Sequence, residues 1–334
     1  MSSGPFPTPS QIPTAADVDA AARRLAGHAV RTPLVFSPVL SERVGARAYL
    51  KPETLQRTGS FKFRGAFNRM VQIPEADRPA GVVACSSGNH AQGVAAAAQI
   101  LGMPAVIVMP HDAPALKRDR TRALGAEVVG YDRRTEDRDA IARAIAAERG
   151  ATMVPPYDDP QIIAGQGTVG LEIVEDLAAL GHAPDVVAAN ASGGGLCAGI
   201  ALAVKRAAPQ ARIVACEPAG FDDHARSFRS GVRERNPEPS GSFCDALLAP
   251  TPGALTFEIT RALVGEAASV TDAEVGRAVE YAFRELKLVV EPGGAVALAS
   301  LLEGRLDVPG GGTVVIVLSG GNVDADTFIR CIGA

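Results

Sequence analysis

Short, continuous apolar runs alternate with helix-like segments along most of this 334-residue chain, and this alternation restricts the fold more than any other feature. One series has apolar runs at 82–85, 105–109, 127–131 and 152–154, separated by helix-like segments at 89–101, 114–124 and 136–149. A second series has apolar runs at 185–189, 213–216 and 314–318, with helix-like segments that end near 208, lie near 255–264, extend from 272 to about 286, and lie near 324–331. Apolar strands joined by helices are typical of parallel sheets with both faces covered. We therefore expect an α/β protein, with a long loop over 231–252.

The composition excludes several classes of protein. With 47% hydrophobic and 21% charged residues, the chain is globular rather than disordered. A net charge of −4 argues against nucleic acid as a partner. No apolar run reaches the ~18 residues that suggest a membrane span, and residues 1–14 lack the pattern of a secretory signal. The five cysteines are scattered without C-x-x-C spacing, which favours a reducing compartment over a disulfide or zinc framework.

Lys62 lies between two aromatic residues in the run Thr58-Gly59-Ser60-Phe61-Lys62-Phe63-Arg64-Gly65-Ala66. Burial against such rings disfavours the ammonium form and lowers the pKa of a lysine. A neutral amine can then condense with a carbonyl group to form a Schiff base. Taken alone, the run is also compatible with a surface lysine whose stem passes two aromatic rings.

Glycines dominate the turn Ser192-Gly193-Gly194-Gly195-Leu196, which follows the apolar run at 185–189 and opens a helix. Consecutive glycines let backbone N–H groups converge on an anion, and the helix dipole favours negative charge at that end. The turn therefore predicts a phosphate cup. It matches neither a Walker A loop nor a dinucleotide-binding turn, and the alternative is a set of glycines needed for close packing alone.

Two further turns of small polar residues follow predicted strands: Ser86-Ser87-Gly88-Asn89-His90 and Ser319-Gly320-Gly321-Asn322. The first offers hydroxyl groups, an amide and a helix N-terminus, which suit a carboxylate. In the second, Ser319 can share a hydrogen bond with a ring nitrogen. Ordinary helix capping is the alternative for both turns. Because ligands of open α/β sheets bind at the carboxyl ends of strands, the three turns are candidates for one shared site.

A buried amine, a phosphate cup and a serine at another strand end match the aldehyde, phosphate and ring nitrogen of pyridoxal 5′-phosphate (PLP). These motifs follow Lys51-Pro52-Glu53-Thr54-Leu55-Gln56-Arg57 in the order of a known family. From about residue 12 onward, the chain resembles the fold-type II PLP-dependent serine/threonine dehydratases and serine racemases. The resemblance implies two open, twisted, mainly parallel sheets flanked by helices. It also implies a large PLP-binding domain over 1–80 and 159–334, and a small domain over 81–158 carrying the substrate-carboxylate loop.

The resemblance implies roles for individual side chains. Lys62 would bond to PLP and act as the base at the substrate α-carbon, and Ser87 is the second candidate catalytic residue. Phe61 would pack against the cofactor ring. Asn89 would bind the ring hydroxyl, and Ser319 would face the ring nitrogen.

Two anion-binding sites follow from the same resemblance. The phosphate would lie on the backbone of Gly193, Gly194, Gly195 and Leu196, with the hydroxyl of Ser192 in place of a fourth glycine. The substrate carboxylate would be held by Ser86, Ser87, Asn89 and His90.

Three carboxylates lie within the segment Glu217-Pro218-Ala219-Gly220-Phe221-Asp222-Asp223, directly after a predicted strand. Clustered carboxylates suit a hard divalent cation such as Mg²⁺ or Ca²⁺. In metal-dependent relatives the ligands match Glu217, the backbone carbonyl of Phe221, and Asp223. The alternative is a capped turn in which Asp222 or Asp223 begins the next helix.

The resemblance implies elimination of water from L-threonine or L-serine to give a 2-oxo acid and ammonia. A neutral hydroxyl at Ser319 supports a protonated ring nitrogen only weakly, which favours elimination over reactions that need a long-lived carbanion. Racemisation of serine is an alternative, because Ser87 matches the second acid–base group of racemases. Dehydration of 3-hydroxyaspartate is another, with the extra carboxylate facing one of Arg226, Arg229, Arg233 or Arg235. A PLP-binding regulatory module without turnover is the alternative of another class, and the retained Lys62 argues against it.

We further expect a cytoplasmic homo-oligomer, most simply a homodimer, whose partners include neither nucleic acid nor membrane. We expect no C-terminal amino-acid-sensing domain, because the chain ends shortly after the helix predicted near 324–331. We therefore expect a role in amino-acid catabolism without feedback by isoleucine.

Overall fold

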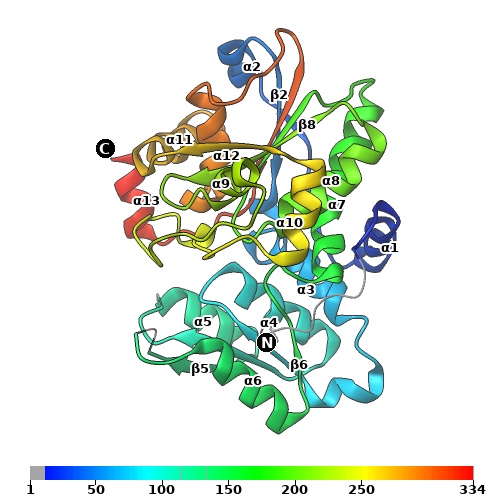
Figure 1. Ribbon diagram of the computed structural model, residues 1–334, viewed down its shortest axis with the longest axis vertical. Coiled ribbons are helices and arrows are strands. Elements are labelled where there is room, and N and C mark those ends of the chain that lie inside the picture. Colours follow the sequence, from blue (N-terminus) through cyan, green and yellow to red (C-terminus); the bar gives the residue numbers. More distant parts are fainter. Residues whose placement is uncertain (1–11, 114, 133, 334) are drawn as a thin grey trace.

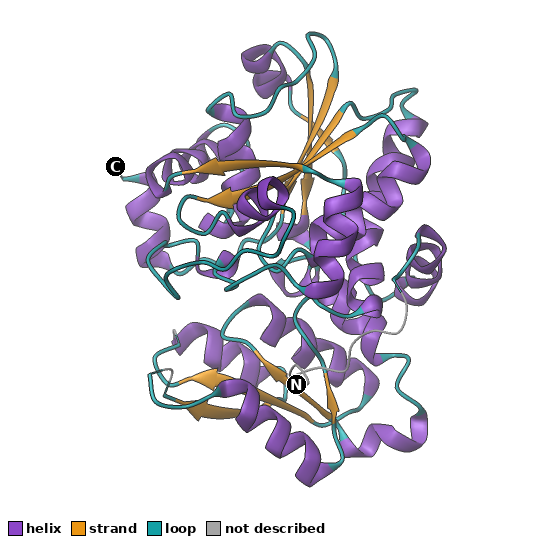
Figure 2. Ribbon diagram, viewed as in Figure 1, coloured by secondary structure: helices purple, strands orange, loops and turns teal. Residues whose placement is uncertain are grey.

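The computed structural model describes residues 12–113, 115–132 and 134–333, and within them it contains two β-sheets flanked by helices (Figure 1; Figure 2). The larger sheet has six strands in the order β1-β2-β10-β7-β8-β9, and the smaller has four in the order β5-β4-β3-β6. Neighbouring strands are parallel except for β1 and β2. The predicted fold class is therefore confirmed.

The larger sheet is covered by helices on both faces. Its strands are β1 (Val35–Phe36), β2 (Arg47–Pro52), β7 (Val186–Asn190), β8 (Arg212–Pro218), β9 (Glu266–Val270) and β10 (Thr313–Leu318). Val314 and Ile316 of β10 pack in one core with α11 (Asp272–Arg284) and α12 (Pro292–Leu302). Val315 and Val317 pack in the opposite core with α7 (Pro160–Ala179) and α8 (Gly195–Ala207). Burial on both faces explains the unbroken apolar run of β10.

The smaller sheet is built in the same way. Its strands are β3 (Val82–Cys85), β4 (Ala105–Pro110), β5 (Glu127–Tyr131) and β6 (Thr152–Met153). Val82 and Ala84 pack with α3 (Lys62–Met70) and α4 (Asn89–Leu101), whereas Val83 packs with α6 (Arg138–Arg149). Because α3 also contacts α7, it joins the smaller sheet to the larger one.

A buried ionic network fixes the start of α3. The guanidinium of Arg64 lies 2.8 Å from Glu53 and 2.6 Å from Glu172, and Nζ of Lys51 lies 2.6 Å from Glu172. These groups come from β2, α3, α7 and the turn after β2. Removing one partner of a buried ion pair leaves an uncompensated charge, which typically costs about 3–5 kcal/mol. The network therefore holds the turn preceding Lys62 in one place.

The predicted long loop is confirmed, because residues 231–253 contain only the short 3₁₀ helix η4 (Asp245–Leu247). The remaining helices are α1 (Ala15–Leu25), α2 (Pro38–Val44), α5 (Ala115–Ala123), α9 (Asp223–Ser230), α10 (Ala254–Leu263) and α13 (Ala325–Ile332). Strands β1, β2 and β9 and helices α1, α2, α3, α7, α9 and α12 are additions to the predicted elements. Of residues 1–14, for which the sequence predicts no secretory signal, residues 1–11 lie outside the described part. Within that part, no helix has the length and hydropathy needed to cross a membrane.

Candidate active site

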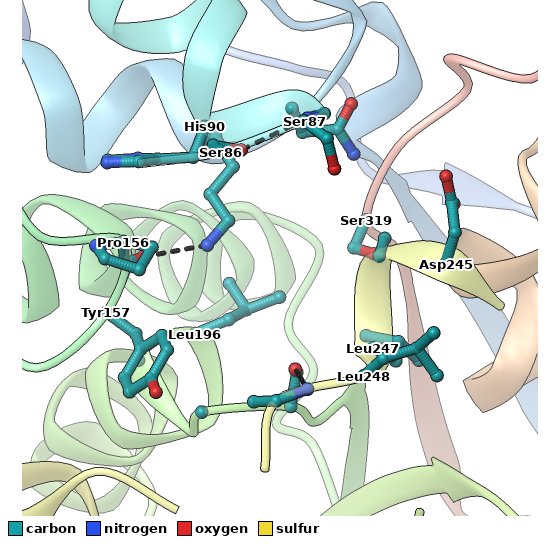
Figure 3. Close-up of a pocket in the computed structure, with 18 of the residues that line it drawn as sticks. Ser86, Ser87, His90, Pro156, Tyr157, Leu196, Asp245, Leu247, Leu248 and Ser319 are labelled. Atoms are coloured by element: carbon teal, nitrogen blue, oxygen red, sulfur yellow. Dashed lines mark hydrogen bonds between the residues drawn. The ribbon is translucent and has the colours of Figure 1, made fainter. Parts of the chain in front are cut away.

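A cavity of about 460 Å³ lies where the carboxyl ends of β3, β7 and β10 meet the start of α3 (Figure 3). It is lined by all the residues that the sequence assigns to the cofactor or to the substrate α-carboxylate: Phe61, Lys62, Ser86, Ser87, Asn89, His90, Ser192, Gly193, Gly194, Gly195, Leu196 and Ser319. The three turns therefore share one site, as their positions at strand ends predict. The candidate metal ligands Glu217, Phe221 and Asp223 are not among the described residues of this lining.

Lys62 begins α3 and contributes its side chain to the cavity wall. Its Nζ donates a hydrogen bond to the carbonyl of Pro156 at 2.8 Å and lies 5.2 Å from the centre of the Phe61 ring. Burial lowers the pKa of Lys62 from 10.5 to about 8. Much more of the amine is therefore neutral near pH 7 than in an exposed lysine. The predicted lowering of this pKa is confirmed, although Phe63 belongs to the core around α4.

The glycines of the turn after β7 sit where side chains have no room. An added Cβ on Gly193 would lie 2.4 Å from the ring of Tyr157, and one on Gly195 would lie 3.1 Å from the Cβ of Tyr157. Gly194 has a φ of +92°, which a residue with a Cβ rarely adopts, and it is the N-cap of α8. The first N–H groups of a helix have no intrahelical partner. This turn therefore places free backbone donors against the cavity, as an anion site requires.

Hydrogen bonds from behind the turn orient its peptide groups. Nε2 of His224 lies 2.9 Å from the Ser192 carbonyl, and Oγ1 of Thr256 donates to the Gly193 carbonyl at 2.6 Å. In a trans peptide the C=O and N–H groups point in opposite directions. The N–H groups of Gly193 and Gly194 consequently point away from these two donors. These two hydrogen bonds therefore orient the backbone N–H groups of the cup toward an anion.

The hydroxyl of Ser192 also contacts the long loop. Its Oγ accepts a hydrogen bond from the backbone N–H of Ala249 at 3.2 Å. Residues 245–250 of this loop line the cavity. The serine that stands in place of a fourth glycine therefore connects the cup to a second wall of the site, and its own hydroxyl hydrogen remains free to be donated.

Ser319 is held by Asn190 at the end of the neighbouring strand. Nδ2 of Asn190 donates to Oγ of Ser319 at 2.9 Å, and Oδ1 of Asn190 accepts from the backbone N–H of Ala297 at 2.6 Å. The backbone N–H of Ala297 can only donate, so the atom of Asn190 that it contacts is the amide oxygen, and the amide nitrogen faces Ser319. Oγ of Ser319 is therefore an acceptor toward Asn190, and its hydrogen is available for a group in the cavity.

The ring of His90 is a neutral imidazole in this structure. Its Nε2 lies 3.0 Å from the Val154 carbonyl, so Nε2 carries the hydrogen, and Nδ1 has no partner among the described residues. Burial, followed by the charge of Lys62, lowers the pKa of His90 from 6.5 to about 3. A bare lone pair on Nδ1 cannot donate to a carboxylate. The ring thus does not suit the predicted carboxylate role, whereas backbone N–H groups at the start of α4 do.

Asn89 is oriented by two residues from distant parts of the chain. Its Nδ2 donates to Oε1 of Glu291 at 2.5 Å, and its Oδ1 accepts from Nδ2 of Asn322 at 2.8 Å. Glu291 lines the cavity and is 2% exposed. Burial raises the pKa of Glu291 from 4.5 to about 7. The sequence patterns do not single out Glu291, which precedes a Pro-Gly-Gly helix start and has no motif around it.

Among the described residues, the cations Lys117 and Arg138 also line the cavity, although the motifs do not single them out. Lys117 of α5 forms an ion pair with Asp245 of η4, which joins α5 to the long loop. Arg138 begins α6, and its side chain is 48% exposed. The four arginines suggested for a second substrate carboxylate are not among the lining residues, so that suggestion is wrong. Arg226, for example, instead bonds Asp222 and Asn236.

Glu217 and Asp223 lie together, as their spacing predicts. One ligand atom from each of Glu217, Asp223 and His224 lies within 4.8 Å of the others, and all three residues are buried. Glu217 accepts the backbone N–H groups of His224 at 2.8 Å and Ala225 at 2.9 Å, so it also caps α9. Burial raises the pKa of Glu217 well above 4.5 and that of Asp223 to about 6. Phe221 is buried in the same turn.

The model of the family described as pyridoxal-phosphate dependent enzymes matches residues 25–320. The chain therefore belongs to this family. It is 44% identical to an L-threo-3-hydroxyaspartate ammonia-lyase of a Pseudomonas species, over 95% of this chain and 98% of the relative. It is 43% identical to an L-threonine ammonia-lyase of Thermotoga maritima, over 96% of this chain and 78% of the relative. The structure of maize serine racemase matches with a TM-score of 0.89 and 34% identity, over 97% of this chain and 98% of that one.

These comparisons confirm the predicted family, its fold-type II architecture and its dependence on PLP. The three similar proteins are named for three different activities. The choice among those activities therefore depends on the residues around the cavity.

Proposed function

We propose that this protein is a PLP-dependent lyase that removes water from a small hydroxy amino acid and releases a 2-oxo acid and ammonia. The observation that supports this most is that Lys62, the glycine cup and Ser319 line one cavity. They match the aldehyde, the phosphate and the ring nitrogen of PLP in number and in chemistry. Phe61 and Asn89 complete the wall against which the ring and its hydroxyl group would lie.

The residues present fit PLP. The N–H groups of residues 193–196 would bind its phosphate, and the free hydrogen of the Ser319 hydroxyl would bind its ring nitrogen. When bound, PLP would supply an electron sink beside the substrate α-carbon. Lys62 would hold the aldehyde carbon of PLP, and the lowered pKa of its amine suits removal of the α-proton.

The turn over 86–90 would hold the substrate carboxylate. Ser86 and Ser87 offer hydroxyl groups there, and Asn89 and His90 offer backbone N–H groups at the start of α4. Oγ of Ser86 accepts the backbone N–H of Gly88 at 3.1 Å, which leaves its hydroxyl hydrogen for the substrate. We assign the ring of His90 to positioning this turn against Val154 rather than to the substrate.

Arg138 supports 3-hydroxyaspartate as a second candidate substrate. Arg138 lines the cavity at the start of α6, and it forms an ion pair with the neighbouring Asp139 at 3.8 Å. A guanidinium in this position can bind the second carboxylate of such a substrate. Threonine and serine lack that group, so Arg138 would not distinguish between them.

Ser87 supports serine racemisation as a further candidate activity. Racemisation needs a proton donor on the face of the α-carbon opposite Lys62, and the Ser87 hydroxyl lines the cavity (Figure 3). The same hydroxyl also suits the substrate carboxylate. We therefore rank racemisation below elimination.

Borohydride reduction of the PLP-loaded protein tests the main proposal. We expect the reduced cofactor on the peptide that contains Lys62, and we expect Lys62→Ala to abolish ammonia release from threonine, serine and 3-hydroxyaspartate. Lys205 on α8 offers a matched control, because Lys205→Ala should preserve both results. An adduct on another lysine would contradict the assignment. Bound PLP without ammonia release from any of the three substrates would instead support the regulatory module.

We also propose that Glu217, Asp223 and the carbonyl of Phe221 bind a divalent cation such as Mg²⁺ or Ca²⁺. The residues fit a cation, since Oδ2 of Asp223 is buried without a hydrogen-bond partner among the described residues. Carboxylate and carbonyl oxygens are the ligands that such ions prefer. The capping role of Glu217 is compatible with this, because each carboxylate oxygen can accept more than one interaction.

Three organisational features complete the proposal. We assign residues 81–158 to a small domain and the rest of the chain to a large one, with the cavity between them.

We infer a homodimer, supported by the exposed apolar side chains of Val35, Phe36 and Val39 around the edge strand β1. Light scattering on the purified protein checks the dimer. The five free cysteines support the cytoplasm as its compartment.

A further inference from the structure

His224 stands between the acidic turn and the phosphate cup. Its side chain is fully buried, and its Nε2 lies 2.9 Å from the carbonyl of Ser192. Because a carbonyl oxygen only accepts hydrogen bonds, Nε2 carries the hydrogen and Nδ1 carries the free lone pair. Nδ1 is buried and has no hydrogen-bond partner among the described residues. The structure thus contains a buried imidazole whose lone pair is unused.

The same residue belongs to the carboxylate cluster. Ligand atoms of Glu217, Asp223 and His224 lie within 4.8 Å of one another. Oδ2 of Asp223 is a second buried atom without a partner in the described chain, whereas Oδ1 accepts from Asn236 at 2.7 Å. An unsatisfied buried polar atom typically costs about 1–3 kcal/mol. A cation held by both Asp223 and His224 would give each of these two atoms, one oxygen and one nitrogen, a partner.

We propose that Nδ1 of His224 is a nitrogen ligand of the divalent cation, together with Glu217 and Asp223. This inference rests on the metal site proposed above and goes beyond an all-oxygen site. Metal-bound histidines usually donate their other ring N–H to a carboxylate, a backbone carbonyl or water, and His224 donates to the carbonyl of Ser192 in this way. Its tautomer is therefore already the one that a metal requires.

A nitrogen ligand changes which cations the site prefers. Oxygen-only sites suit Mg²⁺ and Ca²⁺, whereas imidazole favours first-row transition metals, with affinity rising from Mn²⁺ through Co²⁺ to Ni²⁺. We expect this site to bind Co²⁺ more tightly than Mg²⁺. The imidazole also connects the cation to the phosphate cup, because the same ring orients the Ser192 carbonyl.

Calorimetric titration of the metal-stripped holoenzyme with CoCl₂ and with MgCl₂ tests the proposal. His224→Gln is the informative variant, because the amide N–H of Gln can still donate to the Ser192 carbonyl, while the imidazole nitrogen is lost and only a hard amide oxygen remains. We expect it to weaken Co²⁺ binding by ~10- to 100-fold, the loss typical when a metal site is disturbed, and to change Mg²⁺ binding less than threefold. His182→Gln, which removes an imidazole close to Tyr49, is the matched control and should change neither affinity.

The outcomes separate the two proposals. Unchanged Co²⁺ affinity in His224→Gln would overturn the nitrogen ligand and leave an all-oxygen metal site intact. Wild-type protein that binds neither cation would overturn the metal site itself. A second measurement avoids the variant altogether, since pulsed electron paramagnetic resonance of the Mn²⁺-loaded wild type should show a directly bound ¹⁴N nucleus. A spectrum without that nitrogen signal would also overturn the proposal.

Discussion

Replacing Gly194 by alanine should weaken PLP binding through the shape of the cup alone. Gly194 has a φ of +92°, and the left-handed region costs an L-residue about 1–2 kcal/mol. The added Cβ would also lie 2.9 Å from Cε1 of His224 and 3.0 Å from Cβ and Oγ1 of Thr256. These two side chains hold the carbonyls behind the cup. Displacing them would weaken one or two hydrogen bonds that contribute about 1 kcal/mol each.

The total strain in Gly194→Ala is therefore about 2–4 kcal/mol. The turn over 192–196 can relieve this strain by adopting a different backbone conformation, which no longer binds a phosphate. Since each 1.4 kcal/mol is a factor of ten, the dissociation constant of PLP should rise roughly 30- to 1,000-fold. Titration of the apoenzyme with PLP, followed by visible absorbance, measures this change. The melting temperature of the apoenzyme should fall much less than that of the holoenzyme, because only the bound state needs the strained conformation.

Gly276→Ala is the matched control for this experiment. Gly276 lies within α11, has no atom within 4 Å of an added Cβ and is far from the cup in sequence. Alanine is favoured over glycine in a helix by about 1 kcal/mol, so this variant should be slightly more stable and bind PLP normally. A Gly194→Ala protein whose PLP affinity stays within twofold of the wild type would refute the proposed geometry of the cup.

Three further predictions concern other walls of the cavity. Ser87→Ala should lower racemisation by the ~10²–10⁴-fold typical of general acid catalysis while elimination from the L-isomer continues, and equal loss of both in activity assays would mark Ser87 as a binding residue. Arg138→Ala should lower kcat/KM for 3-hydroxyaspartate by ~10- to 100-fold, the worth of a charge-assisted hydrogen bond, and change threonine turnover little; parallel losses on both substrates would contradict this. Burial raises the pKa of Glu291 from 4.5 to about 7, so the unfolded chain releases this proton first and wild-type stability should fall as pH rises from about 4.5 to 7. Glu291→Gln should remove that fall, at most ~3 kcal/mol, in melting curves across this pH range, and an unchanged slope would show that another group causes it.

The elements that sequence patterns predict best are those buried on two faces. The apolar runs of β3, β7 and β10 are visible because nearly every residue in them is buried, and the turns after them follow from their positions at strand ends. Helix α12 lacks such a signal, since Pro292-Gly293-Gly294 reads as a turn although it opens a buried helix. The short strand β1 pairs antiparallel with β2 at the edge of the larger sheet, and its two residues are too few to form an apolar run.

Sequence patterns likewise predict only part of the candidate active site. Residues within motifs, such as Lys62 and Ser319, could be named from the sequence because their neighbours make the pattern. Glu291 and Arg138 could not, because each reaches the cavity through contacts between distant segments and is surrounded by unremarkable sequence. The bond between Asn89 and Glu291, for instance, spans 202 residues. Only the packing of two sheets brings such pairs together.

The hydrogen bond from Asn190 to Ser319 has a consequence for how this enzyme responds to acidity. Neither an amide nor an aliphatic hydroxyl gains or loses a proton at physiological pH, so the hydrogen that Ser319 offers to the cavity is present under all cellular conditions. Glu291, at the edge beside Asn89, changes its protonation close to neutrality. One side of the cavity therefore keeps a constant hydrogen-bonding character while the other side varies with pH. A change in activity near pH 7 would therefore reflect the protonation of Glu291 beside Asn89. The hydrogen bond offered by Ser319 would stay the same over this pH range.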